Sequence, residues 1–329
     1  MKFTEEKLEK AFIELLGNEN FPHHLGNTLT RAVDEVIIEE DLTAYLLAKY
    51  ESKQLTQTEA KSIVLQLKTL PASDLYESNL TIMRWLSDGF ILKREDRNQK
   101  DIHIELIDYN GLEAQLASPD LDTIVAEPNI KYPKDYNIYK FVNQLEIVGS
   151  EKRIPDGIIY INGLPVVVFE FKSAIREEAT IHDAFKQLTV RYRRDIPELF
   201  KYNAFCVISD GVNNKAGSFF APYEFYYAWR RVAGLAKDVD GIDSMFTLVQ
   251  GMLHQNRLRD IIRNFIYLPD SSKKTRKLFV AIRNTMQPND FSTILNGHKN
   301  HKAMVKAALT LEQQAAEKAL PCFTLPAYL

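Results

Sequence analysis

The stretch that decides the fold is residues 153–172, which read RIPDGIIYINGLPVVVFEFK. At its centre, Asn162-Gly163 is a residue pair typical of a two-residue β-turn, because both positions tolerate a positive φ. A β-branched run at 158–161 precedes the turn, and an apolar run at 165–171 follows it. The sequence therefore predicts a tight β-hairpin whose two arms lie side by side.

Three charged side chains stand on this hairpin. Asp156 comes just before the first arm, while Glu170 and Lys172 lie two residues apart on the second and share one face. Two carboxylates can hold Mg²⁺, with Mn²⁺ as a substitute, because hard cations take oxygen ligands. A neighbouring lysine can orient the attacking water and offset developing negative charge. The pattern predicts a metal site at Asp156 and Glu170 that hydrolyses phosphodiesters.

The alternative is an ordinary ion pair between strands on an exposed face. Residues 166–169, Val-Val-Val-Phe, are apolar without alternation, as in a strand that is buried on both faces. Charges at the end of such a strand are costly unless they are paired or bound to a metal. This pattern favours the metal site, and the structural ion pair remains the alternative.

Asp156, the Glu170-x-Lys172 pair and the hairpin resemble the PD-(D/E)xK nuclease superfamily. More narrowly, residues 153–174, RIPDGIIYINGLPVVVFEFKSA, resemble the N-terminal nuclease of type I restriction enzyme R subunits. The resemblance covers roughly residues 1–270 and is most specific over 153–211. It implies a type I site-specific deoxyribonuclease in which Asp156, Glu170 and Lys172 are catalytic.

The resemblance also implies roles for residues outside the hairpin. Gln187 and Tyr192 match the Gln and Tyr of the RecB-like branch, where they orient the active site or the DNA backbone. Alternatively, Tyr192 is a core residue and Gln187 a solvated one. Many nucleases of this superfamily have a further acid on an early helix, and Glu9 is our candidate for this metal ligand. Glu5 and Glu6 are rival candidates for this ligand. It also remains open that these acids simply form a solvated helix face.

A basic cluster ends the helix that carries Gln187. Arg191, Arg193 and Arg194 could contact DNA phosphates. Cations in the last turn of a helix also complement its dipole, so a purely structural role is equally open.

The fold that we expect is α/β, a restriction-endonuclease-like mixed β-sheet core flanked by helices, with an N-terminal helical subdomain. We expect residues 1–110 to be an N-terminal helical and strand region, 111–270 the nuclease core and 271–329 a tail outside the family pattern. The expected elements are helices at 4–16, within 42–86, at 180–194 and within 242–267, and strands within 90–109, at 141–147, 158–161, 165–171 and 204–208.

The tail differs in composition from the rest of the chain. From Lys273 onward it carries nine Lys or Arg and three Asp or Glu. R subunits continue into an ATP-hydrolysing motor that begins with a Walker A loop, and none stands here. Read one codon position out of frame, residues 278–287 and 305–329 can encode the motor's start, including G-x-x-x-x-G-K-S. We therefore expect a frameshifted, poorly ordered tail, with ATP needed only by the intact motor.

Bulk properties suggest location and partners. The net charge of −3 argues against DNA binding by bulk charge alone. The two cysteines, Cys206 and Cys322, form no metal or redox pattern, and no signal peptide or membrane segment is visible, so we expect a cytoplasmic protein. The resemblance implies double-stranded DNA and the specificity and methyltransferase subunits as partners. Two other functions stay open: a stand-alone RecB-like repair nuclease, and an inactive DNA-binding or docking remnant.

Overall fold

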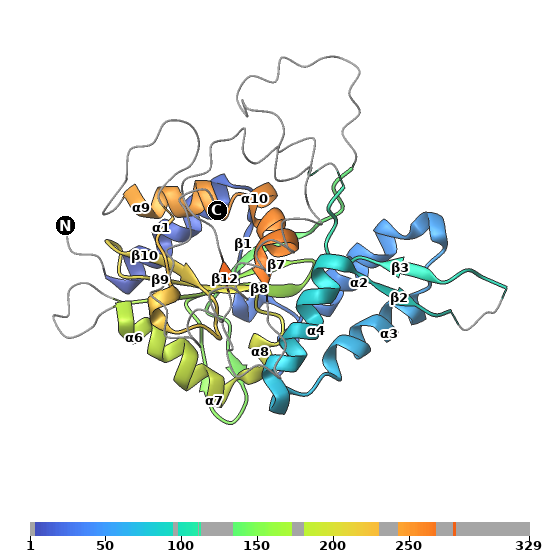
Figure 1. Ribbon diagram of the computed structural model, residues 1–329, viewed down its shortest axis with the longest axis horizontal. Coiled ribbons are helices and arrows are strands. Elements are labelled where there is room, and N and C mark those ends of the chain that lie inside the picture. The colour runs from blue at the N-terminus through green and yellow to red at the C-terminus, as the bar shows by residue number, and fades with distance from the viewer. Residues whose placement is uncertain are drawn as a thin grey trace, which may run out of the picture.

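The centre of the molecule is a mixed β-sheet (Figure 1). The computed structural model describes residues 4–94, 98–110, 112, 134–172, 181–229, 243–267 and 279–280. In the six-stranded sheet, β1 pairs with β4 and β8 with β9 in parallel, and the other neighbours are antiparallel. The mixed sheet with flanking helices confirms the predicted α/β class. In spatial order its strands are β1 (His23–Leu25), β4 (Tyr139–Asn143), β7 (Gly157–Ile161), β8 (Leu164–Phe171), β9 (Phe205–Ser209) and β10 (Asn214–Gly217).

Short antiparallel ribbons accompany the main sheet. The strand predicted at 141–147 is wrong in its second half, because β4 ends at Asn143 and Gln144 turns the chain with φ 51°. The ribbons are β2 (Phe90–Leu92) with β3 (Ile102–Ile104), β5 (Ile147–Val148) with β6 (Lys152–Arg153), and β11 (Ile266–Tyr267) with β12 (Phe279–Val280).

The predicted N-terminal helices are confirmed. The first begins where the Thr4 hydroxyl accepts a hydrogen bond from the Lys7 backbone N–H at 3.3 Å, and it buries a leucine and phenylalanine face. The N-terminal helices are α1 (Glu5–Asn18), α2 (Glu39–Lys49), α3 (Gln57–Lys68) and α4 (Leu75–Asp88), with 3-10 turns η1 (Gly26–Thr28), η2 (Glu51–Lys53) and η3 (Ala72–Asp74).

The later helices are shorter and repeatedly adopt π geometry. The helix predicted at 180–194 is present from Ile181, since residue 180 lies outside the described residues, but its middle is a π-helix. These elements are α6 (Ile181–Lys186), η4 (Gln187–Tyr192, π), α7 (Arg193–Asp195), α8 (Pro197–Phe200), η5 (Tyr223–Phe225, 3-10), α9 (Asp243–Phe246), η6 (Thr247–Met252, π), α10 (Gln255–Asp260) and η7 (Ile261–Phe265, π).

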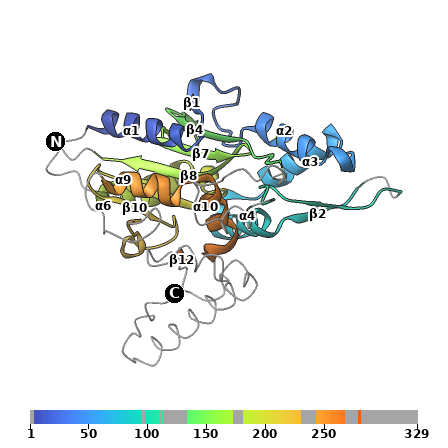
Figure 2. The same ribbon diagram turned by 90° about the horizontal axis from the view of Figure 1, so that it is seen from above.

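Strand β8 lies inside the sheet and is buried along its whole length. On one face, Phe169 and Phe171 pack against Phe12 of α1, with ring centroids 5.6 and 4.8 Å apart. Alternate residues, Glu170 among them, point to the opposite face. Figure 2 shows α1 on one side of the strands and α6 on the other. The apolar run without alternation therefore correctly predicted a strand covered on both faces.

The turn of the hairpin has the predicted geometry. Asn162 and Gly163 both have positive φ, 52° and 75°. The backbone N–H of Ile38, before α2, donates to the Gly163 carbonyl at 2.9 Å, so an early segment packs on the turn. The N-terminal region thus contributes α1 and β1 to the same core as the hairpin. The boundary that we placed at residue 110 stays a prediction.

Two further expectations concern the C-terminal tail and membrane-spanning segments. Of the tail 271–329, only Phe279–Val280 is described, so its frameshift origin and its order stay predictions. Across the described ranges, no helix has the length and apolar character required to cross a bilayer.

Candidate active site

The hairpin places Asp156 opposite Glu170. Gly157 pairs with Phe169 in the antiparallel register. One position farther from the turn, Asp156 therefore stands opposite Glu170, and their side chains share one face. The Asp156 carboxylate accepts a 2.5 Å hydrogen bond from the Phe171 backbone N–H, which belongs to the peptide that follows Glu170. The two carboxylates predicted to converge therefore do so, although thirteen residues separate them.

Lys172 joins them from the end of β8. Its ammonium lies 2.7 Å from a Glu170 carboxylate oxygen and 2.9 Å from the Phe171 carbonyl oxygen. Its backbone N–H donates to the Ser209 carbonyl, which continues the pairing of β8 with β9 and fixes the direction of the side chain. The ion pair of the alternative interpretation thus forms, but along one strand and in a buried place.

Burial dominates the electrostatics of the two acids. It raises the pKa of Asp156 to about 6, against the hydrogen bond from Phe171 and the charge of Lys172, which lower it. The Glu170 side chain is fully buried, and burial together with the charge of Asp156 raises its pKa to about 8. One lysine is too little positive charge for a buried and a half-buried carboxylate near neutral pH, so the pair favours protons or a further cation.

The donor set fits a hard divalent cation. Carboxylate oxygens and a backbone carbonyl are the ligands that Mg²⁺ takes, and Mg²⁺ usually needs only one or two carboxylates because it keeps several waters. Within the described residues, no group of three or more His, Cys, Asp or Glu side chains is arranged to hold a metal. The fit therefore rests on Asp156 and Glu170, and their role as ligands stays a prediction.

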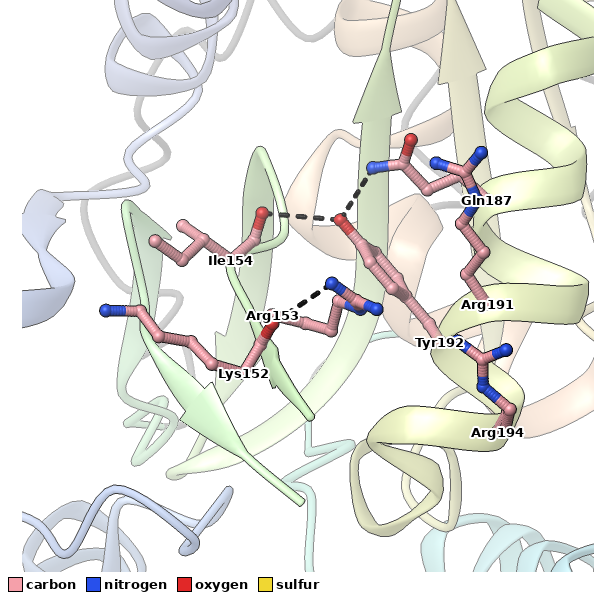
Figure 3. A pocket seen from close by; sticks show the side chains of 7 residues that line it. All are labelled: Lys152, Arg153, Ile154, Gln187, Arg191, Tyr192 and Arg194. Atoms are coloured by element: carbon pink, nitrogen blue, oxygen red, sulfur yellow. Dashed lines mark hydrogen bonds between the residues drawn. The ribbon is translucent and has the colours of Figure 1, made fainter. Parts of the chain in front are cut away.

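Tyr192 and Gln187 reach the site from the helix beside the sheet. The Tyr192 hydroxyl donates to the second Glu170 oxygen at 3.0 Å. The Gln187 side-chain amide donates to the Tyr192 hydroxyl, also at 3.0 Å (Figure 3). Tyr192 is buried, as the alternative interpretation expected, yet it also holds Glu170 by a hydrogen bond. Burial and the nearby Glu170 charge raise its pKa far above the usual value, so it remains a donor.

Glu9 lies near the site, on the other face of the sheet. The helix that carries Glu9, α1, covers the phenylalanine face of β8, which is opposite to the face of Glu170. The Glu9 carboxylate instead accepts hydrogen bonds from Asn143 at 2.7 Å and Gln144 at 3.0 Å, at the end of β4. The charges of Glu5 and Glu9 still help to raise the pKa of Asp156. Glu9 as a metal ligand stays a prediction.

The other rival acid is engaged elsewhere. Glu6 forms an exposed ion pair with Lys10 at 2.6 Å, one helical turn along α1. Sequence reasoning missed the two amides that hold Glu9. They stand more than 130 residues after it, and no local pattern marks them.

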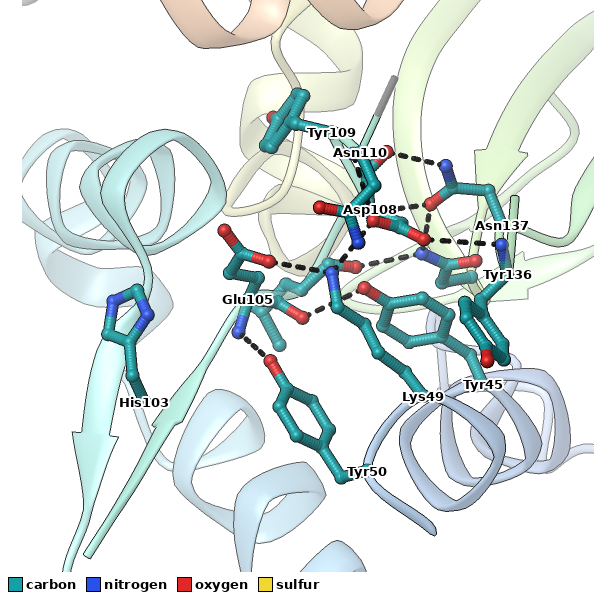
Figure 4. A network of polar contacts seen from close by, with 12 residues as sticks. Tyr45, Lys49, Tyr50, His103, Glu105, Asp108, Tyr109, Asn110, Tyr136 and Asn137 are labelled. Atoms are coloured by element: carbon teal, nitrogen blue, oxygen red, sulfur yellow. Dashed lines mark hydrogen bonds and ion pairs between the residues drawn. The ribbon is translucent and has the colours of Figure 1, made fainter. Parts of the chain in front are cut away.

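A buried polar network anchors the region behind the hairpin (Figure 4). Lys49 of α2 lies 3.0 Å from the fully buried Asp108 carboxylate, and Arg259 of α10 donates to the Asp108 carbonyl at 2.8 Å. Asn137 accepts from the Asp108 backbone N–H at 2.8 Å and from the Asn162 side chain at 2.9 Å. The turn that aligns β7 and β8 is thus tied through Asn137 and Asp108 to α2 and α10.

Comparison with known proteins agrees with this geometry. The profile of the family described as type I restriction enzyme R protein N terminus matches residues 2–225. The type I restriction enzyme HindI endonuclease subunit of Haemophilus influenzae is 29% identical over 286 residues, 85% of this chain and 25% of that protein. The type I restriction enzyme SsaAORF53P endonuclease subunit of Staphylococcus saprophyticus is 33% identical over 153 residues, 45% of this chain and 15% of that protein. The chain thus spans a quarter or less of the length of these relatives. With more than half of its residues matched by the family profile, the chain belongs to the family of type I restriction enzyme R protein N termini.

Proposed function

We propose that this chain is the nuclease portion of a type I restriction enzyme R subunit and hydrolyses DNA phosphodiester bonds with Mg²⁺. The observation that carries the proposal is the convergence of Asp156, Glu170 and Lys172 at the open end of a buried hairpin. The relatives' names, endonuclease subunits of type I restriction enzymes, support the same reaction.

The polar side chains of the site have separate roles in this reaction. Asp156 and Glu170 would hold the cation, which lowers the pKa of a bound water and stabilises charge on the phosphate. Lys172 orients the water and offsets negative charge that develops on the phosphoryl oxygens. Tyr192 keeps one Glu170 oxygen fixed by hydrogen bonding, and Gln187 in turn fixes the Tyr192 hydroxyl. Tyr192 and Gln187 therefore act as positioning residues.

The remaining activities of an intact enzyme belong to parts outside this chain. We propose that DNA translocation and ATP use reside in the motor, and that specificity and methyltransferase subunits supply sequence recognition. This chain alone should then cut slowly and without sequence preference. Its cytoplasmic location is part of the proposal and agrees with Cys206 being a buried free thiol.

A plasmid-nicking assay tests the proposal. We expect supercoiled DNA to be nicked slowly in Mn²⁺ or Mg²⁺ and not in a chelator, with Lys172→Ala at least about 100-fold slower. The matched control is Lys61→Ala, which removes the same charge from an exposed position on α3 and should nick like the wild type.

Other outcomes would favour other functions. Equal nicking by wild type and Lys172→Ala would refute the assignment. No nicking together with no Mn²⁺ binding would support an inert remnant. Rapid cutting of branched or nicked DNA would instead support a stand-alone repair nuclease.

A further inference from the structure

A basic cavity of about 540 Å³ lies directly beside the active site. One wall comes from the segment that leads to Asp156, and the opposite wall from η4 and α7 (Figure 3). Gln187 and Tyr192 form its inner edge, so the cavity and the Glu170 site share side chains. Among the described residues, no Asp or Glu lines the cavity. Its cations are Lys152, Arg153, Arg191 and Arg194.

The three arginines of the basic cluster predicted at the end of the helix that carries Gln187 do not all line the cavity. Arg191 and Arg194 line the cavity. Arg193, between them in sequence, turns the other way: its guanidinium lies over the Phe219 ring at 4.8 Å and donates to the Phe219 carbonyl. Two of the three arginines are therefore available to a ligand in the cavity, and the third packs against protein.

A single buried carboxylate, that of Asp195, holds two of the cavity's arginines in place. Asp195 accepts from Arg153 at 2.6 and 2.7 Å and from Arg194 at 2.6 Å, and its side chain is fully buried. The hydrogen bond from Arg194, with support from Arg153, holds the pKa of Asp195 at about 2, so it stays charged. Both guanidinium groups are thus fixed before any ligand arrives.

Among the cavity's cations, Arg191 is the one that no acid of the described residues neutralises. Glu146 pairs with Lys152, and the charge of Glu151 acts on Arg194. The exposed Arg191 makes no hydrogen bond or ion pair with another side chain in the part of the chain that the structure describes. A guanidinium that has no partner among the described residues, beside two that are held by Asp195, suits the forked geometry with which arginine binds phosphate oxygens.

We propose that this cavity binds a backbone phosphate of DNA next to the phosphate that is cut, with Arg191 as its main contact. The assignment of a neighbouring phosphate rests on the proposed nuclease function, because Tyr192 joins the cavity to Glu170. Binding of the DNA backbone at Arg191 does not require that cleavage occurs. The cavity would position the strand and carry no sequence information.

Fluorescence anisotropy of the full chain with a labelled duplex, in a chelator so that nothing is cut, tests the proposal. We expect Arg191→Gln to weaken binding about 5- to 10-fold at low salt and to reduce the slope of log K against log salt by about 1. Arg191→Lys should keep the slope because it keeps the charge. The matched controls are Arg193→Gln, which removes the neighbouring charge, and Lys61→Gln on α3; both should bind like the wild type.

The outcomes separate the two proposals. Unchanged affinity and slope in Arg191→Gln, or no binding of the duplex by wild type, would overturn the phosphate site. Inorganic phosphate that competes as strongly as duplex phosphates would also overturn it, in favour of a free-anion site. Binding that depends on Arg191 without nicking in Mn²⁺ would leave the cavity assignment standing while the proposed nuclease function fails.

Discussion

At the scale of single residues, the burial of Glu170 links the protein's stability to pH. Its folded pKa of about 8 lies above the unfolded value near 4.5. The contribution of Glu170 to stability is therefore fully present below about pH 4.5 and is lost as pH rises through 8. Without metal, we expect the unfolding free energy to fall over this range by at most about 5 kcal/mol.

Thermal unfolding of the metal-free chain from pH 5 to pH 8 measures this effect. Glu170→Gln should flatten the profile, because its amide does not ionise. Mg²⁺ should restore stability at pH 8, since it binds the charged carboxylates. A wild-type profile that rises steadily to pH 8 without metal would contradict the assigned burial of the acids.

The hydroxyl of Tyr192 offers a second test at this scale. Its hydrogen bond lowers the pKa of Glu170, so Tyr192→Phe should raise that pKa. The acid limb of the pH–rate profile should move to higher pH, and nicking should slow by about 10-fold near neutral pH. A slower rate with an unmoved limb would mean that Tyr192 acts only through packing.

The sequence was sufficient to predict which charged side chains of the hairpin come together, because a turn signal and a period of two determine which side chains meet. Asp156, Glu170 and Lys172 needed no distant information. The hydrogen bonds that hold Glu9 did, because Asn143 and Gln144 approach it only after the sheet has formed. The φ of 51° at Gln144 has no signal as strong as an Asn-Gly pair.

At the scale of elements, the π-helix η4 explains how Gln187 meets Tyr192. Residues five apart on a straight α-helix point about 140° away from each other, because each residue turns by about 100°. The wider π turn brings them onto one side, where Gln187 can donate to the Tyr192 hydroxyl. An amphipathic pattern predicts a helix but not this change of helix type, which often occurs at functional sites.

The hairpin turn makes a prediction at the same scale. A Cβ on Gly163 would lie 2.2 Å from the Ile38 carbonyl oxygen, and its φ of 75° already disfavours other residues. We expect Gly163→Ala to destabilise the protein by about 3 kcal/mol or more in urea unfolding. In the control Gly17→Ala, a helical glycine has open space around it, and stability should be unchanged or rise by up to about 1 kcal/mol. Equal stability of the two variants would show that the turn does not determine the fold.

At the scale of the whole molecule, the network around Asp108 joins distant parts of the chain. Asp108→Asn would leave the buried Lys49 ammonium with Glu105 as its one acidic partner among the described residues. Because removing one partner of a buried ion pair exposes the other to an apolar interior, we expect a loss of about 3 kcal/mol in urea unfolding. The control Glu6→Gln breaks the exposed pair with Lys10 and should leave the unfolding midpoint unchanged. Matching midpoints for the two variants would contradict this role.

The class and central strands of the fold could be predicted because their signals are local. The contribution of residues 23–25 to the sheet could not, since this strand of three residues pairs with β4 more than a hundred residues later. The network around Asp108 was equally hidden, because its members come from α2, the segment after β3, and α10. Long-range pairing of this kind depends on the assembled core rather than on any short pattern.

Diffraction from crystals soaked in Mn²⁺, recorded for its anomalous signal, tests the central claim most directly. We predict one strong peak between the carboxylates of Asp156 and Glu170, within about 2.1 Å of an oxygen of each and beside the Lys172 ammonium. The peak should vanish in Asp156→Asn. A peak at another cluster, or none at this hairpin while Mn²⁺ binds elsewhere, would contradict the account.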